Sequence, residues 1–221
     1  MAMQAQGIKL RRASTVTVDS SDSTGMTLSA NKIECSGVID FEELGFTTAM
    51  RLSISGGDDT GYYPIRAVAA TIIDVYGTLT AQTTNLVLTG YSMESIGEVT
   101  DFTGPGGAAA VIDLTGLQST AKEKLMGLRD EGQLTLNVNF NATDAGQVGL
   151  RSDRADRRKG LYDMVFTDIT PSASVIPSNC WFQGYCLNYN ISGAVDQKVA
   201  AAITLEIDGP VVMATHMTVT T

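Results

Sequence analysis

The side chains of this 221-residue chain that could perform catalysis are few, and their spacing argues against catalysis. His216 is the only histidine and lies in the terminal segment MATHMTVTT, where a general base would lack the fixed partners of a catalytic triad. Cys35, Cys180 and Cys186 form no CxxC pair, and with one histidine they supply no clustered zinc ligands. We therefore expect no catalytic residue, no metal and no cofactor, and three reduced structural thiols.

Three polar segments have residue types that can bind ions or phosphate. The acidic turns DSSDSTG and GGDDTG concentrate oxygen ligands suited to Ca²⁺ but lack EF-hand spacing, so we favour solvated turns. The segment GPGG, residues 104–107, is followed by no GK[ST] and predicts a flexible turn rather than a phosphate loop.

The run RSDRADRRK, residues 151–159, carries five positive and two negative charges. It lies in the polar segment 141–161, which we interpret as a long loop between two strands. The run could be a solvated loop tip, contact phosphate or pair with an acidic patch on a neighbouring subunit. Of the two functional roles we favour the subunit contact, with these candidates: Arg151, Arg154, Arg157, Arg158 and Lys159.

The net charge of −9 and pI of about 4.5 disfavour specific DNA binding, since nucleic-acid-binding surfaces are normally basic. An acidic balance suits either ordinary solubility or a surface past which DNA slides. The N-terminal MAMQAQGIKLRR has no apolar signal core, and no stretch is apolar for long enough to span a bilayer. We therefore expect a soluble protein without a general export signal.

Frequent glycine, serine and threonine, with short alternating runs between turn clusters, predict a mainly β protein. Strands are expected at residues 15–19, 50–55, 68–77, 85–90, 108–115, 133–140, 164–169, 185–191 and 203–208.

Three of these strands alternate strictly between apolar and polar residues, so each should bury one face and leave the other wet. The expected buried residues are Leu134, Leu136, Val138, Tyr185, Leu187, Tyr189, Ile191, Ile203, Leu205 and Ile207. The expected wet residues include Thr135, Asn137, Asn139, Cys186, Asn188, Asn190, Thr204, Glu206 and Asp208. The wet faces alone fit an ordinary solvent-exposed sheet surface.

Residues 120–131 predict the single helix of the fold. Thr120 and Glu123 have capping-box spacing, and Gly132 stands where a glycine commonly ends a helix. Ala121, Leu125 and Leu128 form an apolar stripe at i, i+4 and i+7. We therefore expect Leu125 and Leu128 to pack into the core against a sheet.

The order of segments over about residues 83–212 resembles the major tail tube proteins of long, non-contractile phage tails, the lambda-like siphophage family. The resemblance rests on TTNLVLTG, SIGEVTDF, the Gly/Pro break, IDLT, STAKEKLMGLRDEG, LTLNVNF and FQGYCLNYNISGAVDQKVAAAITLEIDGPV, in that order. It implies a β-sandwich or open barrel of two antiparallel sheets with one flanking helix. It also implies a structural protein: six copies close a ring with a continuous inner β-barrel, and terminal arms and a long loop stack the rings into a conduit for DNA ejection.

The resemblance also implies partners and a location. The partners are further copies of the chain and the tape-measure, tail terminator and tail-tip proteins, with double-stranded DNA passing non-specifically and no membrane insertion. The location is the virion tail, after assembly in the host cytoplasm. The implied lumen-facing candidates are Thr135, Asn137, Asn139, Asn188, Asn190, Thr204, Glu206 and Asp208.

The sequence pattern divides the chain near residue 80, after a first part of short alternating runs between turn clusters. Residues 1–80 are expected to be a β-rich segment with a first strand or arm plus a decoration or enlarged loop, and the resemblance implies that residues 81–221 are the tail tube domain with a C-terminal arm. We expect residues 24–63 to form an inter-ring contact or an outward insertion. Two alternatives remain open: a ring-forming tube of a secretion or phage-derived delivery apparatus, and a β-rich enzyme or carbohydrate-binding module. The last would need a cleft with convergent titratable groups and a stacking aromatic, and Trp181 is the only tryptophan.

Overall fold

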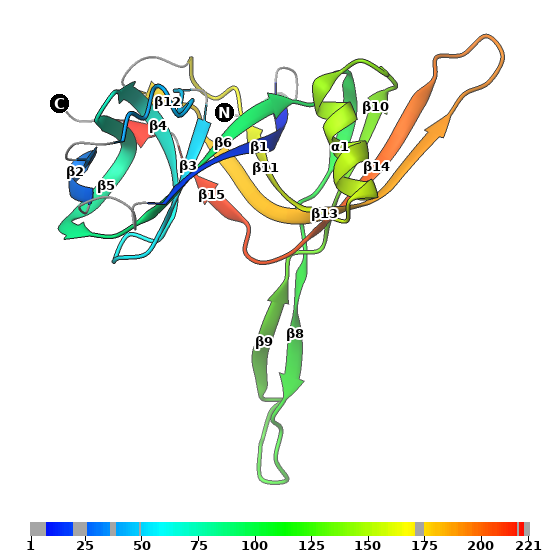
Figure 1. The fold of residues 1–221 in the computed structure, drawn as a ribbon. Helices are drawn as coiled ribbons and strands as arrows, with labels where there is room; N and C mark the ends of the chain where they lie inside the picture. Colours follow the sequence, from blue (N-terminus) through cyan, green and yellow to red (C-terminus); the bar gives the residue numbers. More distant parts are fainter. Residues whose placement is uncertain are drawn as a thin grey trace. The chain divides into compact units, whose positions relative to one another are not determined.

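The computed structural model describes residues 8–19, 26–35, 39–48, 50–170, 175–215 and 217–218. His216 and the acidic turn at residues 20–25 lie outside this described part. Within it the chain is mainly β, with antiparallel strand pairs and a single α-helix (Figure 1), which confirms the expected fold class. The helix found in these ranges is too short to cross a membrane.

The chain divides into two compact units. Unit 1 comprises residues 1–95, 163–179 and 213–221, and unit 2 comprises residues 96–162 and 180–212. The division expected near residue 80 concerns the limits of the tail tube domain and stays a prediction.

Unit 1 is built from antiparallel strands in the order β2-β5-β4-β3-β6-β1. Their bounds are β1 Lys9–Asp19, β2 Met26–Cys35, β3 Met50–Ser55, β4 Gly61–Ala69, β5 Ile72–Thr84 and β6 Val87–Ser95. β12 (Val175–Ile176) pairs with β16 (Met217–Thr218), and β15 is Val212–Ala214. The core of this unit includes Met26, Leu28, Ile33, Leu52, Ile54, Ile73 and Leu88, all almost fully buried.

The single strand expected at residues 68–77 is wrong, because the chain reverses direction inside it. Ala69 pairs with Ile72 across a two-residue turn, so the segment contributes the end of β4 and the start of β5. The apolar, β-branched residues on both sides of the turn concealed it, since neither turn residue is glycine, proline or asparagine.

Unit 2 contains strands in the order β13-β14-β10-β7 and the helix α1, Ala145–Ala155. The strand bounds are β7 Val99–Thr103, β10 Gln133–Asn139, β13 Asn179–Ser192 and β14 Ala200–Ile207. β8 (Ala108–Asp113) and β9 (Lys124–Asp130) form a separate two-stranded sheet (Figure 1). β11 (Lys159–Val165) runs from unit 2 into unit 1 and ends before the expected strand 164–169 is complete.

The period-two pattern holds in β10 and β14. Leu134, Leu136, Val138, Ile203 and Leu205 are buried, as expected. Because these side chains point to one side, the intervening polar residues share the other side of the sheet.

The pattern fails in β13, where the register shifts between Cys186 and Asn188. A bulge adds a residue and reverses which parity faces the core. Tyr185 and Leu187, expected to be buried, are therefore 37% and 52% exposed, whereas Cys186 is buried. Tyr189, after the bulge, is buried as expected, but Ile191 near the end of the strand is exposed.

The helix expected at residues 120–131 is also wrong. Most of this segment is β9, in which Leu125 pairs with Ile112 and Met126 pairs with Val111 of β8. Cross-strand pairing overrides the local helical pattern. Leu125 and Leu128, expected in the core, are 53% and 92% exposed.

The helix lies instead in the segment expected to be a loop, residues 141–161. Asp144 is the N-cap and accepts a hydrogen bond of 2.8 Å from the backbone N–H of Gln147, and Asp156 is the C-cap. The basic run therefore begins on a helix rather than on a loop.

Candidate functional site

The polar side chains of unit 2 gather on one side of the sheet β13-β14-β10-β7, here called the polar face. One row of paired positions contains Asn188, Thr204, Thr135 and Thr103, and the next contains Asn190, Ala202, Asn137 and Asp101. Asn139 and Glu206 lie on β10 and β14 at opposite ends of this arrangement.

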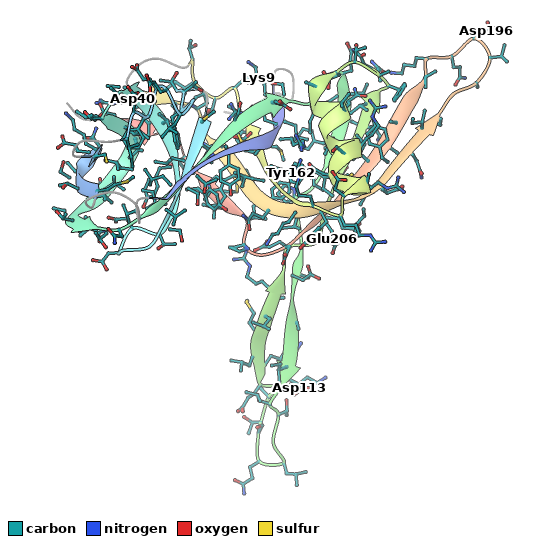
Figure 2. The ribbon with its side chains drawn as sticks, viewed as in Figure 1. Lys9, Asp40, Asp113, Tyr162, Asp196 and Glu206 are labelled. Carbon is teal, nitrogen blue, oxygen red and sulfur yellow. The ribbon has the colours of Figure 1, made fainter. Side chains whose placement is uncertain are left out.

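Seven of the eight lumen candidates thus lie together on the polar face of unit 2. The eighth, Asp208, follows the end of β14 and forms an ion pair of 2.8 Å with Lys159. Figure 2 marks Glu206. Whether these residues line a lumen is a question of assembly and stays a prediction.

Carboxamides of β10 hold carboxylates along the polar face. Gln133 donates a hydrogen bond of 2.7 Å to Glu206, and Asn137 donates one of 2.7 Å to Asp101. A third bond, of 3.1 Å, joins Asn139 to Glu98 just before β7. A carboxamide satisfies a carboxylate but does not neutralise it, so the negative charges persist.

The polar face has no compensating cation of its own, because β7, β10, β13 and β14 contain no lysine or arginine. Glu98 and Asp101 belong to this surface but were not predicted. The signal that could have found Asp101 is the alternation of Asp101, Phe102 and Thr103, in which an apolar residue stands between two polar ones. Glu98 lies beyond the register shift between β7 and β10, so this alternation does not extend to it.

The opposite side of the sheet carries α1, which is fixed there by Gln147. Its buried carboxamide donates to the carbonyl oxygens of Gly97 (3.1 Å) and Asn139 (3.0 Å). Its oxygen accepts from the Asn141 N–H and the Tyr189 hydroxyl, both at 3.0 Å. One side chain thus ties the helix to the end of β10, to β13 and to the segment before β7.

Most of the basic run is engaged within unit 2. Arg158 pairs at 2.5 Å with the buried carboxylate of Asp153, and Lys159 pairs with Asp208. Arg151 donates to the carbonyl oxygen of Ala142 at 2.9 Å and lies over the rings of Phe140 and Tyr189.

Arg154 and Arg157 are the most available cations of this run. Arg154 donates only a long bond of 3.3 Å to the carbonyl oxygen of Leu187. Arg157 follows the helix at a φ of 53°, is exposed, and has no ion pair with any described residue. The expected contact of the five candidates with a neighbouring subunit stays a prediction. Arg154 and Arg157 are the two candidates whose charges are least engaged inside unit 2.

β8, β9 and the loop between them, residues 108–130, form a ribbon that we call the hairpin arm. Figure 2 marks Asp113 at the end of β8, where the loop begins. The arm exposes an unusual amount of apolar surface: Val111, Ile112, Leu114, Leu117, Leu125, Met126 and Leu128. A lone two-stranded ribbon is marginally stable in water, and exposed apolar patches mark interaction sites.

The base of the arm is a close backbone crossing rather than the flexible turn expected of GPGG. Gly106 and Gly132 form a parallel bridge, and a Cβ on Gly107 would overlap the carbonyl oxygen of Asp130. Gly132 also has a φ of 69°, which favours glycine. Glycine is required here because the two backbone segments pass too close to each other to leave room for a side chain.

The remaining chemically active groups are occupied or buried. Asp59 of GGDDTG accepts hydrogen bonds from the backbone and hydroxyl of Thr80 and from Gln82. The described residues contain no group of three or more His, Cys, Asp or Glu that could hold a metal. Cys35, Cys180 and Cys186 are buried and form no disulfide, and burial raises the pKa of Cys186 to about 11.

Comparison with known proteins identifies one family. The family model described as phage tail tube, TTP, lambda-like matches residues 73–217, more than half of the chain. The match spans all of unit 2, and so includes the polar face, α1 and the hairpin arm. No curated protein matches the chain.

Proposed function

We propose a function from the premise that this chain belongs to the lambda-like phage tail tube family. It is a structural phage tail protein, the major tail tube subunit, and stacked hexameric rings of it form a hollow conduit for DNA ejection. The observation that carries the proposal is the polar face, a broad sheet surface whose strands contain no lysine or arginine and on which three carboxylates are each hydrogen-bonded to a carboxamide.

A surface of this kind suits the wall of a DNA channel. Proteins bind DNA phosphates mainly through lysine and arginine side chains, which release the counterions of the DNA. A face without these cations should therefore bind DNA weakly. The hydroxyls and carboxamides of Thr135, Asn137 and Asn190 keep the surface wet without adding positive charge. We therefore place the polar face, with Glu98 and Asp101 added, on the lumen.

Ring closure needs a sheet edge that pairs with a neighbour. Within unit 2, β7 is the last strand of the order β13-β14-β10-β7. An edge strand beside an amphipathic sheet is an aggregation hazard unless a designated partner covers it. Pairing of such edges around six copies would continue the polar face into a closed inner barrel.

Ring stacking is assigned to the hairpin arm. Its apolar residues lie on both strands and in the connecting loop, so they need a cover that the arm's own sheet does not provide. A contact between an arm and a different surface on the next copy is heterologous and does not close, which produces a filament. Arg154 and Arg157 are proposed to supply subunit contacts beside it.

The remaining assignments follow the family. The partners are further copies of the chain and the tape-measure, terminator and tip proteins, with double-stranded DNA in transit and no enzymatic activity. The location is the virion tail after assembly in the host cytoplasm. Residues 24–63 are proposed to add an inter-ring contact or an outward insertion to a tube domain spanning residues 81–221.

The test combines electron microscopy with cysteine labelling. Purified, concentrated protein should form hollow tubes or six-fold rings in negative stain. An Asn137→Cys variant should react with a bulky maleimide as a monomer but be protected in tubes whose ends are capped. The matched control, Val148→Cys on exposed α1 across the sheet, should label in both states. Rapid labelling of Asn137→Cys in capped tubes would contradict the lumen assignment.

A further inference from the structure

Unit 1 contains an acidic turn at residues 40–44 that is held by its own hydrogen bonds. The Asp40 carboxylate accepts hydrogen bonds from the backbone N–H groups of Glu42 (2.9 Å) and Glu43 (3.1 Å). Phe41 and Phe46 are buried on either side of the exposed residues, with their rings edge to face at 5.8 Å. The turn is thus anchored at both ends and closed on itself.

What the acidic turn presents outward is negative charge beside an apolar side chain. Glu42 and Glu43 are exposed and form no ion pair with any described residue, and Leu44 is 43% exposed. Figure 2 marks Asp40 at the start of the turn. Such a surface would be complementary to a basic depression with an apolar wall.

Unit 1 also contains a depression of that kind, which we call the basic pocket. Its volume is about 360 Å³, and four cationic side chains line it: Lys9, Arg11, Arg51 and Arg66. Its apolar wall includes Met50, Ile65 and Ile176. The residues of the acidic turn do not line this pocket.

The cations of the basic pocket outnumber the carboxylates that pair with them. Asp163 is fully buried and pairs with Arg11 at 2.5 Å and with Arg51 at 3.6 Å. Arg66 pairs with Asp74 at 2.7 Å. Among the described residues, these four cations and the two carboxylates in the ion pairs carry a formal charge of +2, because burial lowers the pKa of Arg51 only to about 10.

We propose that the acidic turn of one copy docks in the basic pocket of a second copy. Glu42 and Glu43 lie against the pocket cations, and Leu44 packs on the apolar wall. The proposal rests on the self-assembly proposed above and goes beyond it. The turn and all four cations precede residue 73, where the tail tube match begins, so the charged groups that would meet in this contact lie outside the matched region.

The contact joins two different surfaces and is therefore heterologous, able to close a ring or extend a stack. Its charges are only partly desolvated, so it should weaken with ionic strength. The complementary signs would mainly select the partner surface and speed association, while Leu44 contributes burial.

The first experiment is a charge exchange in the full chain. Glu42→Lys with Glu43→Lys should lower association at least tenfold, measured by sedimentation and by tube yield. The control, Asp196→Lys with Gln197→Lys, adds two lysines at exposed positions of unit 2 that no proposed contact uses, and it should leave association unchanged. Lys9→Glu alone should weaken association, and combined with Glu43→Lys it should recover part of the loss. Normal assembly of the Glu42→Lys, Glu43→Lys protein would overturn the docking.

A second experiment separates this contact from the tube assignment. Glu43→Cys and Lys9→Cys proteins are mixed and treated with a short bis-maleimide. A crosslinked dimer should form in the mixture and in neither protein alone, whether or not tubes appear. Tubes without the crosslink would contradict the docking and leave the proposed function intact. The crosslink without tubes would support the docking and contradict the proposed function.

Discussion

The carboxamide nitrogen of Asn137 lies 2.7 Å from a carboxylate oxygen of Asp101, at paired positions of β10 and β7. An arginine or lysine at position 137 would satisfy the same carboxylate but cancel its charge. The asparagine orients Asp101 and keeps the charge in place. Gln133 and Asn139 do the same for Glu206 and Glu98, so the chemistry recurs along one strand.

This relationship predicts the effect of Asn137→Lys. The variant should still fold, because the introduced ammonium group can pair with Asp101, but it would add a cation to every copy on the proposed lumen surface. Its tubes should retain short duplex DNA at low salt, and ~0.5 M salt should release it. Wild-type tubes and Val148→Lys tubes are the controls and should not retain DNA. Equal retention by all three would contradict a DNA-excluding polar face.

Gln147→Leu should destabilise unit 2. The substitution leaves the Tyr189 hydroxyl and the carbonyl oxygens of Gly97 and Asn139 without their buried partner. The expected loss in the free energy of unfolding is about 2–4 kcal/mol, measured by urea denaturation. Val148→Ala, the adjacent exposed helix position, should change it by less than ~0.5 kcal/mol. A similar loss in both variants would remove the special role of Gln147.

The sequence was sufficient to predict β10 and β14, because strict alternation over seven or eight residues matches a half-buried strand and no other element. It also correctly grouped Thr135, Asn137 and Thr204 on one face. β13 was only partly predictable, since the bulge beside Asn188 leaves no glycine or proline signal and reverses the parity of Tyr185 and Leu187.

The position of the helix could not be chosen by local pattern alone, because the chain contains two capping signals. Thr120 with Glu123 precedes an apolar stripe, whereas Asp144 with Gln147 precedes a segment that contains Gly149 and several charges. The second becomes the helix because Gln147 finds buried partners in the sheet. The first becomes a strand because residues 108–113 pair with it, and that pairing lies outside any local window.

Leu128→Ser should separate assembly from folding. Leu128 is almost fully exposed on the hairpin arm, so its loss should change the free energy of unfolding of the monomer by less than ~0.5 kcal/mol. Tube yield should nevertheless fall, because the arm would lose part of the apolar contact proposed with the next ring. Leu136→Ser, in the buried core, should instead cost at least ~2 kcal/mol of stability. Unchanged tube yield for Leu128→Ser would argue against stacking through the arm.

The thiol of Cys186 should react slowly at alkaline pH. Burial raises its pKa from 9.0 to about 11, so little thiolate forms in the folded protein near pH 9.0. Because the folded pKa is the higher one, the associated stability is fully present below pH 9.0 and is lost as the pH rises toward about 11. Rates of iodoacetamide modification between about pH 7 and 10, with urea-unfolded protein as reference, test this. Equal rates in both states would show that the thiol is not buried.

Gly107→Ala should disable the hairpin arm, and its neighbour provides a close control. A Cβ on Gly107 would overlap the Asp130 carbonyl oxygen, whereas a Cβ on Gly106 would have no atom within 4 Å. The clash must displace one strand of the crossing at the base of the arm, since the obstacles around that Cβ are backbone atoms. We expect Gly107→Ala to lower tube yield at least tenfold and Gly106→Ala to assemble normally.

The same pair of variants shows where the damage lies. Hydrogen exchange should quicken in β8 and β9 of Gly107→Ala, while the amides of β10 and β14 keep their protection. This outcome would mean that the glycine crossing at the base of the arm sets the direction of the arm but does not stabilise the rest of unit 2. If Gly107→Ala assembled as well as Gly106→Ala, the direction of the arm would be set by its partner in the tube rather than by the glycine crossing.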